Sequence, residues 1–220
     1  MTEQNSGSAL CDLYVEFVPV SGASITVFRH PGAQSTICAS DDLSAALDQL
    51  QFDLGEGPRW ETARTGQATV SLDVHLDAHP EWPVFGAAAA ELGVGALFSF
   101  PISMGTQLFG VADLYRELPG PLGDEATARA VRVSHQVAAP AAQFASRSAT
   151  SPVELPGEAA ALRREVHQAT GMILMQLETD AASALAALRG WAFAHDRSVE
   201  EVARDVVARR LDFRQEGQLQ

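Results

Sequence analysis

The sequence predicts an α+β domain, with a mostly antiparallel sheet and flanking helices, linked to a C-terminal all-α three-helix bundle. Up to about residue 145, short apolar runs of strand length alternate with stretches of helical period. Residues 146–157 are rich in small side chains and contain two prolines, as linkers do. Beyond them the apolar period is helical throughout. We therefore place a first domain at residues 1–145, a linker at 146–157, a helical domain at 158–213 and a tail at 214–220.

The first domain is expected to begin with a hairpin. Residues 24–30 and 34–39 are predicted to be its strands, with Pro31 and Gly32 at the turn. In residues 42–51, the apolar positions Leu43, Ala46, Leu47 and Leu50 recur at helical spacing. The remaining predicted elements are a strand at 68–72, a helix at 83–92, strands at 96–103 and 107–115, and a helix at 124–144. Pro140 is expected to kink or fray the end of that last helix.

Each C-terminal helix has its own sequence signal. The second helix is expected to begin after Thr179 as its N-cap. The third begins with a capping box, in which Ser198 and Glu201 satisfy each other's backbone amides. The inward-facing positions are Leu162, Val166, Ala169, Ile173 and Leu177 in the first helix, Leu185, Leu188 and Ala192 in the second, and Val199, Val202 and Val206 in the third. Three short helices with tight connections form a small bundle.

The first of these helices contains the segment QATGMILMQL, residues 168–177, in which a glycine precedes four large apolar residues. Glycine inside a helix costs about 1 kcal/mol relative to alanine, so its presence favours a close approach at this point. The helix also has more apolar surface than two short partners can cover. We therefore predict a homodimer whose contact is formed by Val166, Ala169, Gly171, Met172, Ile173 and Met175.

The charge distribution limits the classes of partner. A net charge of −13 argues against indiscriminate binding to nucleic acid, DNA included, or to anionic membranes. Residues 1–156 hold 7 arginines and 18 acidic residues, whereas residues 157–220 hold 8 arginines and 10 acidic residues. There is no apolar run of the length that spans a membrane, about 18 residues, and no secretory signal at the N-terminus. We expect a cytoplasmic protein whose C-terminal part repels polyanions least.

Catalytic and metal chemistry receive little support from the sequence. Cys11 and Cys38 belong to no CxxC pair, and we expect separate buried thiols in a reducing compartment rather than a disulfide. His75 and His79 are four residues apart, but no third ligand is fixed, so an exposed loop is favoured over a metal site. No nucleophile elbow or catalytic dyad stands out, and an enzyme would need an activated cysteine. We therefore expect neither an enzyme nor a metal protein.

The segment LGEGP, residues 54–58, is glycine-rich and could be taken for an anion-binding loop. It lacks the P-loop pattern and has Glu56 at its centre, which would repel a phosphate. We therefore expect a structural turn.

Two parts of the chain resemble known families. Residues 166–175, VHQATGMILM, followed by Ala184, Leu188-Arg189, Ala192, Arg197 and Val202-Ala203, resemble the ANTAR domain, the RNA-binding module of bacterial transcription antiterminators. The N-terminal part resembles the GAF sensor domain, which often precedes ANTAR in actinobacteria. The stretches that carry this second resemblance are residues 39–42, 47–51, 54–58, 82–85, 96–101 and 110–115. It spans most of residues 10–145.

The resemblance implies that the ANTAR helices dimerise, bind paired stem-loops in nascent mRNA and prevent a terminator hairpin from forming, under the control of the GAF domain. Proteins read RNA loops by stacking on bases while cations hold the backbone. The candidate RNA-binding residues are therefore Arg189, His195, Arg197, Arg204, Arg163 and Arg164, with Trp191 or Phe193 as a stacking surface and with Arg209 and Arg210 as further phosphate contacts. Thr170 stands where ANTAR domains commonly carry a lysine, and Gly190, Phe193 and Glu200 occupy positions that are often polar or basic. These departures reduce the positive charge of the expected surface.

Other interpretations stay open at this point. The arginines can instead form a solvated helical face, paired with Glu165, Glu200, Glu201 and Asp205. The protein can also be a ligand-sensing or protein-interaction dimer in which the bundle serves dimerisation alone. The signature of cyclic-nucleotide-binding GAF domains is absent, and no cysteine follows Cys38 to attach a bilin. The GAF pocket therefore holds an unidentified small molecule or is a filled core.

Overall fold

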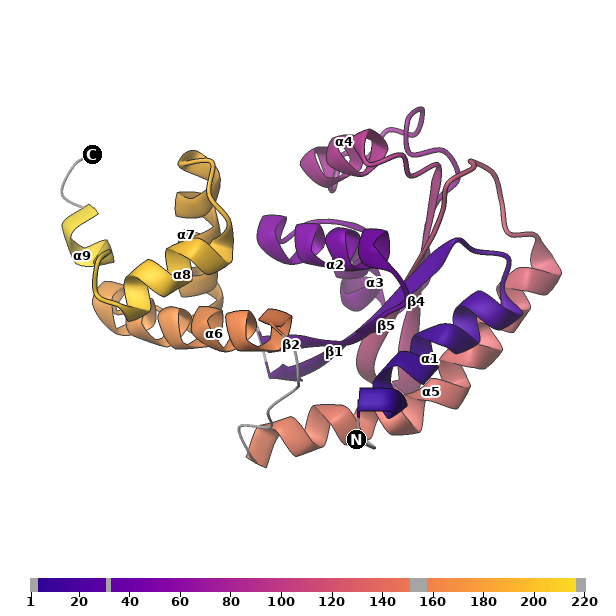
Figure 1. The fold of residues 1–220 in the computed structure, drawn as a ribbon, viewed down its shortest axis with the longest axis horizontal. Helices are drawn as coiled ribbons and strands as arrows, with labels where there is room; N and C mark the ends of the chain where they lie inside the picture. The colour runs from indigo at the N-terminus through magenta and orange to yellow at the C-terminus, as the bar shows by residue number, and fades with distance from the viewer. Residues whose placement is uncertain (1–3, 31–32, 151–157, 217–220) are drawn as a thin grey trace. The chain divides into compact units, whose positions relative to one another are not determined.

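The computed structural model describes residues 4–30, 33–150 and 158–216 (Figure 1). Within these ranges, side chains are described except at residues 4–8, 29–30, 33, 147–150, 158–164 and 215–216. The chain divides into two compact units, one of residues 1–29 and 34–152 and the other of residues 30–33 and 153–220. None of the described helices has the length and apolar character needed to cross a membrane.

The first unit is built on a five-stranded antiparallel sheet in the order β2-β1-β5-β4-β3. The strands are β1 (Gly22–His30), β2 (Ala33–Ala39), β3 (Thr69–Ser71), β4 (Ala96–Met104) and β5 (Gln107–Arg116). Strands β4 and β5 form the central hairpin, in which Leu97 lies opposite Tyr115 and Ser99 lies opposite Asp113. Because successive side chains of a strand point to opposite faces, these residues share one face of the sheet, and their sequence neighbours occupy the other.

Helices α1 (Gln4–Phe17) and α5 (Asp124–Thr150) cover one face of this sheet (Figure 1). Phe98, Phe100 and Leu114 point into the apolar core beneath them. The two helices are joined by a hydrogen bond of 2.8 Å between the hydroxyl groups of Tyr14 and Ser134. This face is therefore closed by apolar packing and by a buried hydroxyl pair.

Helices α2 (Asp42–Leu54), α3 (Pro58–Thr65) and α4 (Pro83–Glu91) cover the opposite face. A capping box between Asp41 and Ser44 begins α2. The apolar part of this face is a cluster that includes Leu47, Trp82 and Phe85. Beside it lies a polar region, and that region positions the candidate site of the first unit.

The second unit consists of helices α6 (Glu158–Leu177), α7 (Ala181–Ala194), α8 (Val199–Val207) and α9 (Phe213–Glu216). Helices α6, α7 and α8 each contact the other two, and α9 packs on α6. The predicted capping box of α8 is present, whereas α7 takes Asp180 as its N-cap, one residue after the predicted Thr179. The fully or nearly buried side chains are Val166, Ala169, Ile173, Ala184, Leu185, Leu188, Ala192, Val199, Val202, Ala203, Val206 and Phe213.

The predicted strands and helices are present, with ends that differ by a few residues. Two helices, α1 and α3, were not predicted. The closing helix does not end at residue 144 but continues through Pro140 to Thr150, into the predicted linker. Val133, Val137 and Ala141 are buried along its apolar face, and this packing outweighs the hydrogen bond that proline cannot make. The rest of the predicted linker, residues 151–157, lies outside the described residues.

Candidate functional site

The candidate site of the first unit is centred on Arg59, the largest fully buried side chain among the described residues. The turn between α2 and α3 places it there. Gly55 ends α2 with a φ of 68°, and Gly57 has a φ of 127°, which other residues rarely adopt. Pro58 then begins α3, and Arg59 follows it in the first turn. The structural turn predicted for residues 54–58 is therefore confirmed, and its consequence is a guanidinium inside the domain.

Two carboxylates from different elements hold this guanidinium. Arg59 Nη2 lies 2.5 Å from Asp48 Oδ1, and Arg59 Nε lies 2.7 Å from Asp113 Oδ2. Burial alone would lower the pKa of Arg59, but the charges of Asp48 and Asp113 outweigh it and raise that pKa above its ordinary value. The group is therefore a permanent cation in the interior.

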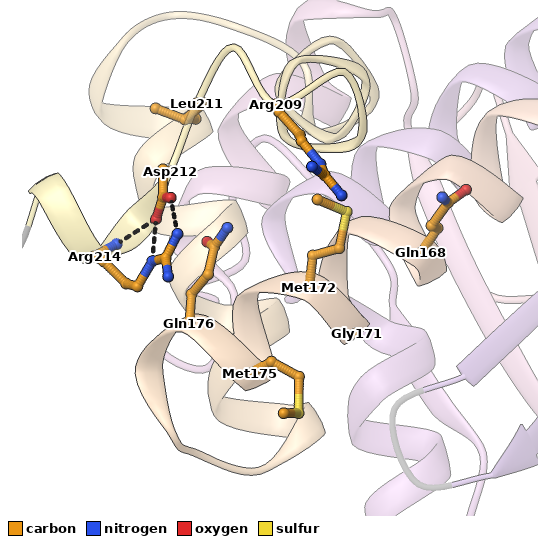
Figure 2. Close-up of a pocket in the computed structure, with 9 residues that line it drawn as sticks. All are labelled: Gln168, Gly171, Met172, Met175, Gln176, Arg209, Leu211, Asp212 and Arg214. Carbon is orange, nitrogen blue, oxygen red and sulfur yellow. Dashed lines mark hydrogen bonds and ion pairs between the residues drawn. The ribbon is translucent and has the colours of Figure 1, made fainter.

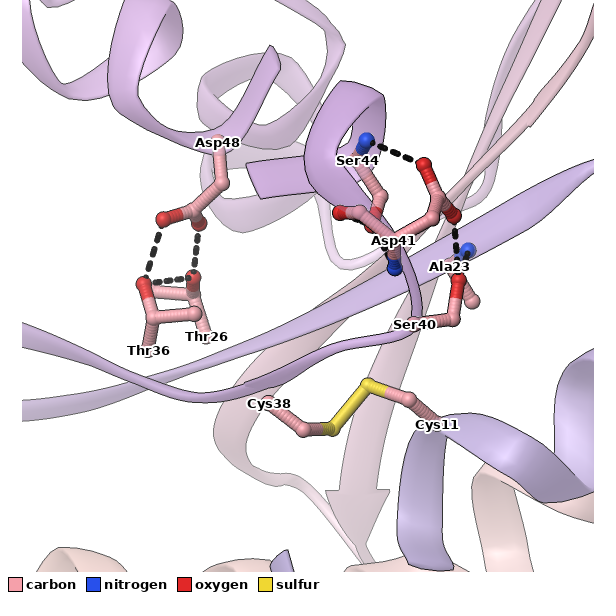
Figure 3. The surroundings of a disulfide bond; sticks show 9 residues. All are labelled: Cys11, Ala23, Thr26, Thr36, Cys38, Ser40, Asp41, Ser44 and Asp48. Carbon is pink, nitrogen blue, oxygen red and sulfur yellow. Dashed lines mark hydrogen bonds between the residues drawn. A yellow bond between two sulfur atoms is a disulfide. The ribbon is translucent and has the colours of Figure 1, made fainter. Parts of the chain in front are cut away.

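Hydroxyl groups of the sheet satisfy the remaining oxygens of these carboxylates. Asp48 accepts hydrogen bonds from Thr26 at 2.7 Å and from Thr36 at 2.6 Å (Figure 3). Asp113 accepts one from Ser99. Buried ion pairs are tolerated when both partners are also hydrogen-bonded. The two carboxylates meet that condition, whereas Arg59 Nη1 is buried with no hydrogen-bond partner among the described residues.

The cavity that adjoins this network is small. Ser24, Ser44, Gln51, Asp113 and Tyr115 contribute its polar lining, and its volume is about 10 Å³. A single water needs roughly 10–15 Å³ on this measure. A small-molecule ligand would therefore need α2 or α3 to move away from the sheet. The structure supports the filled-core alternative for this arrangement of the helices.

The neighbouring loops have structural roles. Glu56, at the centre of the LGEGP turn, accepts a hydrogen bond of 2.7 Å from the amide of Phe85 in the first turn of α4. His79 stacks on Trp82 with 3.7 Å between ring centres, and its Nε2 lies 3.2 Å from the hydroxyl of Ser71. Burial is the main cause that lowers the pKa of His79. Within residues 4–30, 33–150 and 158–216, no three His, Cys, Asp or Glu side chains are grouped as metal ligands.

The cysteines depart from the prediction. Cys11 of α1 and Cys38 of β2 form a disulfide, with 6.0 Å between their Cα atoms (Figure 3). They are buried as predicted, but the expectation of two separate thiols is wrong. The bond lies on the α1 side of the sheet, whereas Thr26, Thr36 and Asp48 lie on the α2 side. It therefore joins α1 to the sheet and takes no part in the Arg59 network.

In the second unit, several of the predicted RNA-binding residues come together where α7 ends. The rings of Trp191 and His195 are stacked, with 3.7 Å between centres and 12° between planes. His195 Nδ1 donates a hydrogen bond of 2.8 Å to the carbonyl of Trp191, which fixes the proton on that nitrogen. The guanidinium carbon of Arg197 lies 5.8 Å from the centre of the Trp191 ring. We call Trp191, His195 and Arg197 the aromatic–arginine cluster.

The other predicted residues lie around this cluster or apart from it. Arg189 is half-buried on α7, and Phe193 is 65% exposed while Trp191 is half-buried. Arg204 lies on α8 and pairs with Glu165 of α6, with 3.5 Å between Nε and Oε2. The side chains of Arg163 and Arg164 lie outside the described part of the chain.

Asp205 connects the aromatic–arginine cluster to a second arginine. Its Oδ2 lies 2.8 Å from Arg197 Nη2, and its Oδ1 lies 2.5 Å from Arg210 Nη2. Sequence reasoning named Asp205 as one of four carboxylate partners but did not find that it joins two arginines. Both Arg197 and Asp205 are half-buried at the surface of the unit. Ion pairs at a protein surface contribute about 0–1 kcal/mol, so water or another anion can replace the carboxylate at low cost.

The hydrogen bonds from Arg197, and then from Arg210, lower the pKa of Asp205 below its ordinary value of 3.8. The stability that this carboxylate contributes is complete above pH 3.8 and is lost as the pH falls through its lower folded value. The variant Arg197→Ala is expected to move the pKa of Asp205 upward, as measured by NMR titration of the carboxyl carbon. Asp180, whose pKa is lowered by the Ser183 amide, is the control and should not move. An unchanged Asp205 titration would contradict the role given to Arg197.

The predicted dimerisation residues fall into two groups. Val166, Ala169 and Ile173 are fully buried in the unit, so their side chains are not available to a second chain. Gly171 is exposed, Met172 is half-buried and Met175 is 74% exposed. Burial thus removes the first group from any surface contact, because those side chains fill the core between the helices. Dimerisation itself stays a prediction. Of the residues predicted to form the contact, Gly171, Met172 and Met175 are the ones that reach the surface.

Comparison with known proteins identifies the first unit. A family model described as the GAF domain matches residues 2–142. No curated protein matches the chain. The match spans the sheet, its covering helices and the Arg59 network.

Solved structures show the same fold. A domain of a protein described as a two-component sensor histidine kinase, from Sinorhizobium meliloti 1021, is 20% identical with a TM-score of 0.52, covering 68% of this chain and 96% of that chain. The GAF domain of a phosphoenolpyruvate-protein phosphotransferase from Coxiella burnetii is 18% identical with a TM-score of 0.52, covering 66% and 86%. A type II free methionine-R-sulfoxide reductase from Thermoplasma acidophilum is 14% identical with a TM-score of 0.50, covering 64% and 94%. Because the family model spans well over half of its residues, the chain belongs to the GAF domain family.

Proposed function

We propose that the protein is a cytoplasmic, non-enzymatic regulator of transcription antitermination, in which the GAF domain controls a dimeric RNA-binding unit. GAF domains are sensor domains typical of signalling proteins, and the first unit is one of them. The second unit resembles ANTAR in sequence and contains α6, α7 and α8 as a helical bundle. Its proposed target is a pair of stem-loops in nascent mRNA.

The aromatic–arginine cluster is the observation that supports this proposal. RNA loops present unstacked bases, and proteins bind them with aromatic or imidazole rings beside cations. His195 is exposed and already stacked on Trp191, so a base laid on His195 would extend an existing stack. Arg197 and Arg210 converge on Asp205 beside it, and a phosphate oxygen can take the place of that carboxylate. Phe193 offers a second exposed ring on the same helix.

The proposed control follows from the chemistry of the first unit. A signal can act only by binding two arrangements of the protein with different affinity. Because the cavity beside Arg59 is nearly filled, the arrangement that admits a ligand at that place is one in which α2 or α3 has moved. The signal would thereby be coupled to the breaking of the Arg59 ion pairs.

The test uses the full-length protein and a pool of RNAs, each with two short hairpins whose loops are randomised. Repeated rounds of RNA capture are expected to enrich a consensus sequence in the loops. The selected RNA should bind the protein more weakly at about 200 mM salt than at about 50 mM salt, because salt weakens contacts with phosphates. His195→Ala and Arg197→Ala are each expected to weaken binding by about 5- to 150-fold, since base stacking contributes roughly 1–3 kcal/mol.

Arg64→Ala is the matched control, because Arg64 is an exposed arginine on α3 of the other unit, and it should leave the affinity unchanged. Each variant must also keep the circular dichroism spectrum of the wild type. If no RNA is enriched while the protein stays folded, the alternative of a ligand-sensing or protein-interaction dimer is favoured.

A further inference from the structure

A groove of about 570 Å³ lies along α6, on the side where the chain returns after α8 (Figure 2). Small-molecule sites typically have volumes of about 300–1,000 Å³. Helix α6 contributes Gln168, Gly171, Met172, Met175 and Gln176, and the opposite wall includes Arg209. Arg209 is the one residue of this lining that the sequence predicted as an RNA contact, through a phosphate.

The floor of the groove is formed by a glycine and two methionines of α6. Gly171 is exposed, and a Cβ added to it would meet nothing within 4 Å, so packing inside the unit does not require the glycine. Met172 and Met175 lie beside it (Figure 2). Thioether groups are polarisable and make favourable contacts with aromatic rings. The floor therefore suits a planar ring laid against the helix.

A cation stands over this floor. Arg209 follows α8 with a φ of 57°, in the left-handed region that residues other than glycine seldom adopt. Its side chain points toward Met172 (Figure 2). Arg197, Arg204, Arg210 and Arg214 each pair with a carboxylate, whereas Arg209 forms no ion pair with any residue whose side chain the structure describes. Its charge is therefore available to an anion in the groove.

Two amide groups, Leu211 and the ion pair of Asp212 with Arg214 complete the lining. The carbonyl oxygen of Gln176 accepts a hydrogen bond of 3.1 Å from the amide of Phe213, which leaves its NH2 group as a donor. Gln168 is exposed and offers both a donor and an acceptor. Side-chain amides of this kind pair with the edges of nucleobases. An inorganic anion would not use the apolar floor, and an acyl chain would not use the amides or the guanidinium.

We propose that this groove binds one nucleotide, with its base against Gly171, Met172 and Met175 and its phosphate on Arg209. The inference deepens the proposed function and rests on it for the source of the nucleotide, which is an unstacked loop residue of the RNA. A free mononucleotide has the same chemistry, so the experiment separates the two sources.

The chain has four methionines, which allows a direct readout. Full-length protein labelled with 13C at the methionine methyl groups is titrated with AMP, GMP, CMP, UMP and inorganic phosphate. At least one of the nucleotides is expected to shift the signals of Met172 and Met175, and phosphate alone is not. Met104, exposed in the first unit, is the internal reference and should not shift.

Two variants locate the site. Gly171→Leu fills the floor at an exposed helical position with open space around it, so the fold should be kept while the shifts disappear. Ala87→Leu makes the same kind of addition at an exposed position of α4 and should change nothing. Arg209→Ala is expected to weaken nucleotide binding by about tenfold, as loss of a charged hydrogen-bond donor does.

The stem-loop RNA selected for the proposed function is then tested on the same variants. Weaker RNA binding by Gly171→Leu, together with nucleotide-induced shifts in the wild type, supports the inference. Shifts with mononucleotides in a protein that binds no stem-loop RNA would keep the nucleotide site and reject the proposed function. Equal RNA binding by wild type and Gly171→Leu, with no methionine shifts, would overturn the inference alone. A loss of dimer mass in Gly171→Leu without nucleotide binding would overturn it in favour of a contact between two copies.

Discussion

Replacing Arg59 by methionine is expected to destabilise the GAF domain by about 3–5 kcal/mol, because it leaves charged partners buried without their cation. Asp48 and Asp113 lie 11 and 54 residues from Arg59 in the sequence, and both accept hydrogen bonds from it inside the domain. The melting temperature should fall by roughly 6–20 °C, since each kcal/mol corresponds to about 2–4 °C for a chain of this size. Calorimetry measures the change, and amide hydrogen exchange shows that it is confined to the first unit.

A combined variant distinguishes loss of the cation from loss of packing. Asp48→Asn and Asp113→Asn in the Arg59→Met background remove the uncompensated charges and should restore most of the lost stability. Arg64→Met, at an exposed position on the same helix, should change stability by no more than about 0.5 kcal/mol. If Arg59→Met were as stable as Arg64→Met, the buried network would not hold α3 on the sheet.

Removal of the Cys11–Cys38 disulfide is expected to cost about 3.5 kcal/mol, by the loop-closure relation for a loop of the observed separation. The two cysteines are 27 residues apart in the sequence. Reduction of the wild type, and the double variant Cys11→Ala/Cys38→Ala, should both lower the free energy of unfolding of the first unit. Denaturant titration measures it, with exchange in the second unit as the internal reference.

The double variant also controls for effects of the reductant itself. Because this variant has no disulfide, its free energy of unfolding should be the same in the presence and absence of reductant. Thiol titration of the unfolded, unreduced wild type tests the bond itself. Two free thiols in that titration would show that the sequence-based expectation was right and that the pairing does not form. The bond fixes α1 to β2 on the face opposite the Arg59 network.

In the C-terminal unit, the features that depend on residues close together in the sequence could be predicted. Ser198 and Glu201 predict the start of α8 because a capping box involves only four consecutive residues. Trp191 and His195 stack because positions four apart share a helix face. The sequence did not give the junction of Arg197 and Arg210 on Asp205, because it requires the chain to turn back after α8.

In the first unit, two helices could not be predicted from the local sequence. Helix α3, PRWETART, was not predicted because its buried side chains include Arg59 and Thr62, so it lacks the apolar stripe that marks a helix in a sequence. Helix α1 was not predicted, although Cys11 and Tyr14 face the core from it. In both cases the helix is stabilised by the sheet residues that it contacts, and these contacts cannot be seen in the local sequence.

By itself, the sequence determined the strand alternation, the turn at residues 54–58, the capping box of α8 and the grouping of rings and arginines near the end of α7. These features depend on residues a few positions apart, whose relative placement the backbone geometry fixes. Only the tertiary structure decided the Arg59 ion pairs, the Cys11–Cys38 bond, the burial of Val166, Ala169 and Ile173, and the groove beneath Arg209. Each of these joins segments that are distant in the sequence, and the folding of the whole unit, rather than any local pattern, brings such segments together.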